Sequence, residues 1–242
     1  KTIDSVRNQI GLDGLEVEHI IIDGASTDGS VDVIKEYESC IVHCQLSISL
    51  KWLSEPDNGI YNAMNKGIKI AFNRSEQSPH YLQIINSGDI LASPDVCARM
   101  AQAVDSNGFP ALLYGNMIKK DFVSGRFIGK SRQTEYSLRN YYHSTLNHDC
   151  CWIRREAYEQ YGLYDETLNV VSDWKWFLMA IGLGKVQPVY VDIDVTIFDA
   201  SGISETNLAL RNQERRKVLE SVLPPAILAD YDRHAFETTQ VD

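Results

Sequence analysis

The sequence predicts an α/β fold in which a mostly parallel central sheet is flanked by helices. Residues 17–22, VEHIII, form an apolar run of strand length, and such runs are typical of parallel strands that are buried on both faces. A turn at Gly24 and capping side chains at residues 26–28 then lead into a helix. This order of strand, turn and helix recurs along the chain, whose 242 residues are enough for one substantial domain.

Apolar periodicity places the other elements of the predicted domain. Further strands are expected at residues 47–53, 81–85, 111–116 and 186–198, with a hairpin over residues 117–130. Helices are expected at residues 1–10, 60–72 and 155–161, and from Ser172 onward. Because an α/β sheet rarely opens with a helix, we expect a first strand upstream of residue 1, so that the chain as given lacks it.

The end of the chain has a different character. We expect the α/β domain to cover residues 1–204 and a helical extension to cover residues 205–242. The extension contains helices near residues 208–223 and 226–236, separated by two prolines, and its residues show no pattern typical of a site.

Composition excludes several functions. A net charge of −10 and a pI near 5.1 argue against nonspecific nucleic-acid binding, which needs a basic face. The five cysteines are odd in number and lack zinc-site spacing, so we expect reduced thiols in a cytosolic protein. No apolar run is long enough to span a membrane, and no signal peptide leads the chain. Neither an EF-hand loop nor a G-x-G-x-x-G fingerprint is present.

Acids follow two of the predicted strands. Asp23 comes directly after residues 17–22, and Asp89 follows the strand at residues 81–85. Carboxyl ends of neighbouring strands face one cleft in open α/β sheets, so we expect the two carboxylates to share a site. Asp followed by Gly is also ordinary turn chemistry, and that alternative stays open for Asp23.

Other polar residues have a structural interpretation beside the functional one. Asp57 and Asn58 lie in a turn before the helix at residues 60–72, which carries Asn65 and Lys66; surface decoration would explain all four. Asp173 lies in the first turn of its helix, where the helix dipole alone favours an acid.

With these residues in view, the chain resembles family 2 glycosyltransferases of the GT-A fold, and is most similar to the bacterial group that builds capsule, O-antigen or colanic-acid polysaccharides. The phrases that carry the resemblance are IIIDGASTDGSVDVI, WLSEPDNGIYNAMNKGI, LQIINSGDIL, WIRREAYEQYGLYDE, VSDW and FDASGIS. They follow the family's order over roughly residues 1–205. The resemblance implies an inverting, metal-dependent transferase that moves a sugar from a nucleotide-diphosphate donor to a hydroxyl.

The resemblance assigns the nucleotide side of the site to five residues. Asp23 matches the acid that binds the base of the nucleotide. Asp57 and Asn58, with Asn65 and Lys66 on the following helix, match the wall that flanks the nucleotide.

The resemblance also assigns the reaction centre. Asp89 matches the last acid of the D-x-D motif, which holds a divalent cation, Mn²⁺ or Mg²⁺, on the donor diphosphate. Asp173 matches the general base that deprotonates the acceptor hydroxyl, and His148 falls on the acceptor side, where an ordinary buried histidine is the alternative. The motif here reads Asn86-Ser87-Gly88-Asp89, so a single protein carboxylate would share the cation with waters and diphosphate oxygens.

The implied partners are a nucleotide-diphosphate sugar, with UDP expected before GDP or dTDP, and a saccharide or lipid-linked saccharide acceptor. A lipid-linked acceptor would place this cytoplasmic protein at the inner face of the cytoplasmic membrane. One alternative is a nucleotide-binding module of a polysaccharide assembly complex that has lost catalysis. Another is a nucleotidyltransferase, although the glycine-rich phosphate loop expected of that class is missing.

Overall fold

The computed structural model describes residues 1–44, 48–73, 81–131, 137–200 and 207–238. The N-terminal half contains α1 (Thr2–Arg7), β1 (Val17–Asp23), α2 (Ser30–Cys44), β2 (Ile48–Ser54), α3 (Ile60–Phe72), β3 (Tyr81–Leu82), β4 (Ile90–Leu91), α4 (Val96–Ser106) and β5 (Leu112–Lys120). The C-terminal half contains β6 (Phe127–Lys130), α5 (Leu138–His143), η1 (His148–Cys150), β7 (Cys151–Arg154), α6 (Arg155–Tyr161), α7 (Ser172–Phe177), η2 (Leu178–Gly182), β8 (Pro188–Asp199), α9 (Leu208–Val222) and α10 (Pro225–Thr238).

The strands form two sheets. β1 and β2 pair in parallel over their whole length, and the remaining strands form a six-stranded sheet in the order β3-β7-β5-β8-β4, with β6 paired to β5. Within that sheet β5 and β8 are parallel, whereas the shorter pairings β3–β7, β4–β8, β5–β6 and β5–β7 are antiparallel. The α/β class with helices around a central sheet is therefore confirmed, but the six-stranded sheet is mixed and not mostly parallel, because β5–β8 is its only parallel pairing among the described residues.

The third predicted strand is shorter than expected. β3 ends at Leu82 instead of continuing to residue 85. The Gln83 amide donates to the carbonyl of Asp149 at 2.6 Å and accepts from the Trp152 indole at 2.9 Å. These side-chain bonds take over from the backbone ladder, and they hold the segment that leads to Asn86 and Asp89.

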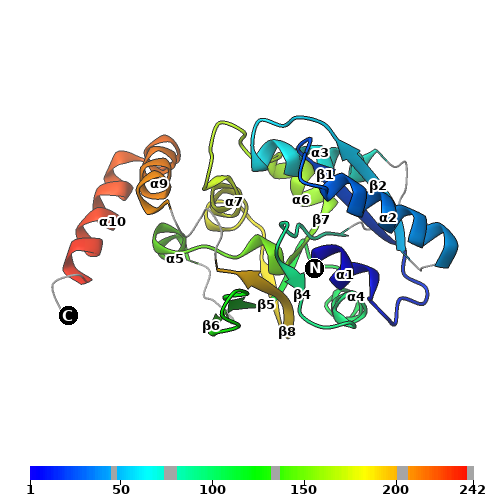
Figure 1. The fold of residues 1–242 in the computed structure, drawn as a ribbon. Coiled ribbons are helices and arrows are strands. Elements are labelled where there is room, and N and C mark those ends of the chain that lie inside the picture. The colour runs from blue at the N-terminus through cyan, green and yellow to red at the C-terminus, as the bar shows by residue number, and fades with distance from the viewer. Residues whose placement is uncertain (45–47, 74–80, 132–136, 201–206, 239–242) are drawn as a thin grey trace.

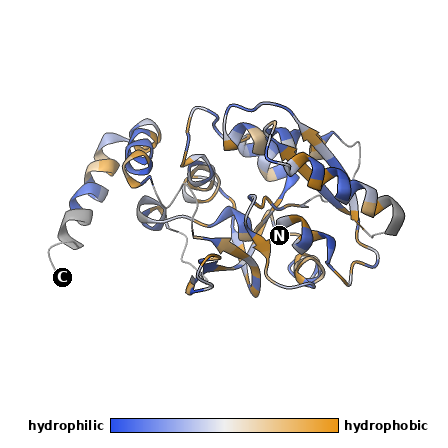
Figure 2. Cartoon of the chain, viewed as in Figure 1, coloured by the Kyte–Doolittle hydropathy of each residue, from blue (hydrophilic) through white to orange (hydrophobic). Residues whose placement is uncertain are grey.

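Both faces of the six-stranded sheet are covered. Leu112 and Tyr114 of β5 belong to a hydrophobic cluster with α3, α6 and α7, whereas Leu113 belongs to a second cluster with α1 and α4. This alternation follows from the two-residue period of a strand. Hydrophobic residues accordingly line the strands, and hydrophilic ones gather on peripheral helices and loops (Figure 2).

The C-terminal helices lie away from the sheet, but α9 packs into the same hydrophobic core. Figure 1 shows α9 and α10 side by side at the edge of the molecule, beyond α7 and α5. Val218 and Leu219 of α9 nevertheless pack in the same hydrophobic cluster as α7. The boundary expected at residues 204 and 205 lies outside the described residues. Across the ranges that the structure describes, we find no helix that combines the length and the hydropathy of a membrane span.

Candidate functional site

Two side chains from distant segments hold the carboxylate of Asp173. Tyr61 of α3 donates its hydroxyl to Oδ1 at 2.9 Å, and Nδ1 of His148 lies 3.0 Å from Oδ2. Burial acts to raise the pKa of Asp173, but the hydrogen bonds from His148 and Tyr61 and the charge of His148 outweigh it and hold the pKa below its usual value. Asp173 is therefore ionised at neutral pH and fixed in orientation.

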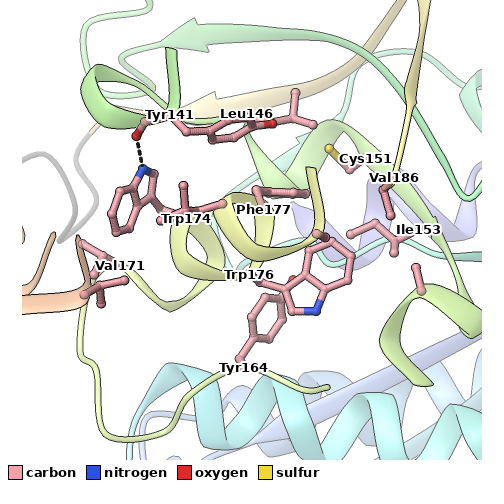
Figure 3. Close-up of a cluster of buried hydrophobic side chains, with 14 of the residues drawn as sticks. Tyr141, Leu146, Cys151, Ile153, Tyr164, Val171, Trp174, Trp176, Phe177 and Val186 are labelled. Atoms are coloured by element: carbon pink, nitrogen blue, oxygen red, sulfur yellow. Dashed lines mark hydrogen bonds between the residues drawn. The ribbon is translucent and has the colours of Figure 1, made fainter. Parts of the chain in front are cut away.

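Aromatic anchors fix α7, the helix that carries Asp173. The indole of Trp174 donates to the carbonyl of Tyr141 at 2.7 Å, and that of Trp176 donates to the carbonyl of Gly162 at 2.8 Å. Figure 3 shows these rings and Phe177 projecting from different sides of α7 into the surrounding core. A short helix has little stability of its own, so this packing determines where Asp173 lies.

The loop before α7 is tied down by α9. The buried carboxylate of Glu214 accepts hydrogen bonds from the backbone N–H groups of Asn169 and Val170 at 2.8 and 2.9 Å, and from the Asn169 amide at 3.1 Å. The guanidinium of Arg215 lies 5.0 Å from the centre of the Trp174 ring. The C-terminal extension thus holds Asp173 from the side opposite the sheet.

His148 connects Asp173 to a second part of the site. Its Nε2 lies 3.2 Å from the amide nitrogen of Asn86, which opens the turn that ends at Asp89. Burial acts to lower the pKa of His148, but the hydrogen bond to Asp173 and the negative charges of Asp173, Asp149 and Asp89 raise it above its usual value. His148 thus links Asp173 to the turn that ends at Asp89. Its role on the acceptor side stays a prediction.

Asp89 is buried beneath this turn. Its Oδ1 accepts the backbone N–H of Asp199 at 2.8 Å, while Thr2 of α1 donates its hydroxyl to the Asp89 carbonyl at 2.7 Å and accepts the N–H of Gly88 at 3.0 Å. Burial raises the pKa of Asp89 to about 6, an effect that the Asp199 N–H opposes and the charge of Asp149 reinforces. α1 therefore holds the backbone of Asp89, and the end of β8 holds its carboxylate.

Asp89 offers a donor that suits a hard divalent cation. Among the described residues we find no hydrogen bond to Oδ2 of Asp89, and a carboxylate oxygen is the kind of ligand that a hard divalent cation takes. Over the described residues, no three His, Cys, Asp or Glu side chains are grouped as a complete metal site. The residues present fit a cation that is held by one protein carboxylate. Water molecules and diphosphate oxygens of the sugar donor would complete its coordination shell.

Asp23 ends β1 at the edge of the smaller sheet. Its Oδ2 accepts the backbone N–H of Ser26 at 3.0 Å and the hydroxyl of Ser54 at 2.6 Å. Burial acts to raise the pKa of Asp23, but these hydrogen bonds prevail and lower it. The carboxylate thus orders its own turn and also binds the neighbouring strand β2, so the structural interpretation of Asp23 has a physical basis beside the functional one.

The turn before α3 lies against the turn after Asp23. The backbone N–H of Glu55 donates to the Asp23 carbonyl at 3.0 Å, and a Cβ on Gly24 would lie 2.5 Å from Oδ2 of Asp57. Only glycine leaves room for the Asp57 carboxylate at that distance. Asn58 follows in the same turn, where its N–H contacts Asn62 Oδ1 at 3.3 Å.

Asn65 and Lys66 are both engaged within the chain. The buried Asn65 amide donates to the Tyr164 carbonyl at 2.9 Å and to Glu166 at 2.8 Å, and it accepts the Tyr164 N–H at 3.0 Å. Lys66 binds Glu55 at 2.8 Å and the carbonyl of residue 56 at 2.9 Å. These contacts make Asn65 and Lys66 supports of the predicted nucleotide wall.

One continuous set of contacts links the predicted residues. Asp23 adjoins the turn before α3, Tyr61 at the start of α3 reaches Asp173, and His148 continues from Asp173 toward the turn that ends at Asp89. Residues from both sheets therefore meet around α3 and α7. The contacts thus connect Asp173 with the turn of Asp89 through His148, whereas Asp23 is linked to them only through the turn before α3.

Comparison with known families identifies the family of this chain. The model of the family described as Glycosyl transferase family 2 matches residues 1–162. The chain belongs to glycosyl transferase family 2. The matched region ends before α7, so it contains Asp23, Asp89 and His148 but not Asp173.

Curated relatives of this family 2 glycosyltransferase come from mycobacteria. An uncharacterized glycosyltransferase of Mycobacterium tuberculosis is 28% identical over 208 residues, which are 84% of this chain and 70% of the relative. A PGL/p-HBAD biosynthesis glycosyltransferase of Mycobacterium bovis is 24% identical over 211 residues, with 84% of this chain and 73% of the relative covered.

Solved structures support the fold of this family 2 glycosyltransferase. S. aureus TarS 1–349 in complex with UDP matches with a TM-score of 0.59 and 16% identity, over 82% of this chain and 55% of that chain. S. aureus TarS matches with a TM-score of 0.61 and 17% identity, over 95% of this chain but 39% of that chain. The chain thus spans about half, or less, of these structures. The expected GT-A fold is confirmed.

The sequence pattern did not single out three residues of this glycosyltransferase's network. Tyr61 and Asn86 lie inside the phrases that carry the family resemblance, which is the signal that could have found them. Glu214 had no such signal, because its importance comes from where α9 packs and from the backbone groups that it meets there.

Proposed function

We propose that this chain is an inverting, metal-dependent glycosyltransferase that moves a sugar from a nucleotide-diphosphate donor, UDP first among them, to a hydroxyl of a saccharide acceptor in surface polysaccharide biosynthesis. The observation that carries the proposal is the ionised Asp173, which Tyr61 and His148 hold next to the turn that ends at buried Asp89.

Asp173 serves as the general base. Its oxygens accept hydrogen bonds from Tyr61, from His148 and from the backbone of Trp174, and a carboxylate with about four lone-pair sites keeps one that can accept the proton of an acceptor hydroxyl. As that proton moves to Asp173, the hydroxyl oxygen attacks the anomeric carbon and the bond to the nucleoside diphosphate breaks. General-base assistance of this kind contributes about 10²–10⁴-fold to rate. A single displacement, with no carboxylate nucleophile, inverts the anomeric centre.

Asp89 would hold the cation on the donor side. A bound Mn²⁺ or Mg²⁺ would supply positive charge to the departing diphosphate oxygens. The chain itself contributes the fixed position of Asp89, which Thr2 and Asp199 hold through the surrounding backbone. Asp23 and Asp57 would form the nucleotide side with Asn58, and Asn65 and Lys66 would support it from α3.

Two similar proteins support the choice of substrates. TarS, the structural neighbour, was solved with UDP. Relatives named as PGL/p-HBAD biosynthesis glycosyltransferases favour a sugar transfer in a biosynthetic route. We further propose that residues 1–204 form the transferase domain. The extension over residues 205–242 would support the general base, because Glu214 of α9 holds the loop that leads to Asp173.

One observation favours a second function. The single acid in the turn from Asn86 to Asp89, without a complete group of metal ligands among the described residues, would also suit a nucleotide-binding module that has lost catalysis. Such a module would bind nucleotide without transferring sugar.

A donor screen followed by single-turnover transfer tests both functions. We expect UDP with Mn²⁺ to raise the melting temperature more than either alone, and a UDP-sugar to be turned over. Asp173→Asn should reduce transfer by about 10³-fold while leaving the UDP-induced shift near that of the wild type. Equal loss of binding and transfer in this variant would contradict the role of Asp173. Nucleotide binding without any transfer across an acceptor panel would favour the second function.

A further inference from the structure

The hairpin between β5 and β6 ends in a well-defined tip. The carboxylate of Asp121 accepts the N–H groups of Val123 and Ser124 at 2.8 and 3.2 Å and the Ser124 hydroxyl at 2.6 Å. The Asp121 N–H donates across the hairpin to the carbonyl of Arg126 at 3.0 Å. Figure 1 shows β6 at the lower edge of the molecule, beside the ends of β5 and β8. The tip therefore presents its side chains in a fixed arrangement.

Three large apolar side chains of this hairpin face solvent. Val123 is 95% exposed, Phe127 is 62% exposed and Ile128 is 43% exposed. Single exposed apolar residues are common on protein surfaces, but a group of them on one projecting element marks a contact surface. β6 pairs only with β5, so its outer edge also lacks a neighbouring strand within the described residues.

The same hairpin is basic on an acidic protein. Residues 119–130 contain Lys119, Lys120, Arg126 and Lys130 against the single acid Asp121, whereas the whole chain has a net charge of −10. The Asp121 carboxylate is taken up by the turn, and Lys130 forms an ion pair with Asp194. The residues of the hairpin itself therefore carry net positive charge beside its exposed apolar side chains, with Asp194 and Asp199 of β8 next to Lys130 and Lys120.

We propose that this hairpin docks on an anionic lipid bilayer. Exposed apolar side chains at the tip and on β6, together with lysine and arginine of the same hairpin, are the combination that enters the headgroup boundary and attracts lipid phosphates. The basic charge argues against a hairpin-to-hairpin contact between two copies of this chain, because two such hairpins would repel each other. The inference does not depend on the proposed sugar transfer.

The position of the hairpin relates the membrane to the candidate site. Lys120, the last residue of β5, pairs with Asp199 of β8, and the Asp199 N–H binds the Asp89 carboxylate. The docked hairpin would therefore hold the Asp89 side of the site close to the bilayer, where a substrate with a lipid anchor would be presented.

Vesicle flotation with the full chain tests this docking. We expect binding to equimolar POPG and POPC vesicles, weak binding to POPC alone, and loss of binding in high salt. Lys120→Gln and Arg126→Gln should each lower the partition coefficient about fivefold. Val123→Ser with Phe127→Ser should lower it by at least about as much. Val33→Ser, which changes a 52% exposed valine on α2, is the matched control and should bind as the wild type does.

Three outcomes would overturn the proposal. The first is equal binding to both kinds of vesicle, and the second is unchanged binding in the hairpin variants. The third is a change in oligomeric state on gel filtration of the Val123→Ser, Phe127→Ser variant without a change in flotation, which would assign the surface to a protein contact. Circular dichroism and melting temperatures that match the wild type would show that the variants fold.

Discussion

Replacing Glu214 by glutamine tests whether α9 holds the loop that delivers Asp173. The carboxylate accepts three hydrogen bonds, from the N–H groups of Asn169 and Val170 and from the Asn169 amide. Glutamine has the same shape but only one oxygen, so its NH₂ group would face one of the two backbone donors. One charge-assisted bond is lost and a buried N–H loses its partner, which together cost about 2 kcal/mol.

The expected loss is measurable in two ways. About 2 kcal/mol corresponds to a fall in melting temperature of about 4–8 °C for a domain of this size, and urea unfolding should give the same free-energy difference. Because the loop leads directly into α7, kcat for sugar transfer should fall while donor affinity, set at the opposite end of the site, should hardly change.

Glu220→Gln is the matched control for this experiment. Glu220 lies on the same helix but is exposed, and it forms a surface pair with Arg216 at 2.7 Å. Surface pairs of this kind contribute only about 0.5 kcal/mol. If Glu214→Gln proves as stable and as active as Glu220→Gln, the claim that α9 positions the base is refuted.

Three further predictions concern the rest of the network. Asp89→Ala should abolish the extra thermal stabilisation by Mn²⁺ in the presence of UDP, measured by differential scanning fluorimetry; an undiminished shift would remove Asp89 from the cation site. The raised pKa of His148 means that its stabilising effect is complete below its ordinary value of 6.5 and is lost as pH rises through the higher folded value, so wild type should exceed His148→Gln in melting temperature by more near about pH 5.5 than near about pH 9. A constant difference would contradict that pairing. Asn65→Ala should destabilise the fold by about 2–3 kcal/mol in urea unfolding, because the Tyr164 N–H and Glu166 lose their partner; a loss confined to nucleotide binding would instead make Asn65 a ligand contact.

Local sequence patterns predicted most of the elements. The helix at residues 60–72 was expected with the bounds that α3 has, and the hairpin, α6 and both C-terminal helices lie close to their expected positions. These segments have an apolar period together with turn or capping residues at their ends, so local forces and burial agree. β3 departed from expectation because side-chain bonds of Gln83 replaced the ladder, which periodicity does not reveal.

The position of an acid after a predicted strand indicated a candidate site residue. The sequence did not reveal which side chains bond to the acids of the site. Asp23 and Asp89 stand out because a carboxylate that follows an apolar run is visible in the linear sequence. The partners of Asp173 come from residues 25 and 112 positions away, and no local pattern reports such contacts. His148 was expected near the acceptor, and the structure adds that it bonds directly to Asp173.

The sequence by itself determined the order of elements, the family phrases and the acids at the ends of strands, because these depend on residues that are close in the chain. Only the tertiary structure decided that Tyr61 and His148 hold Asp173, that Thr2 supports the turn of Asp89, and that Glu214 fixes the loop before α7. The C-terminal helices, whose sequence showed no sign of a site, contribute through packing. Their role depends on which backbone groups a buried carboxylate meets, and that is fixed only when segments distant in sequence come together.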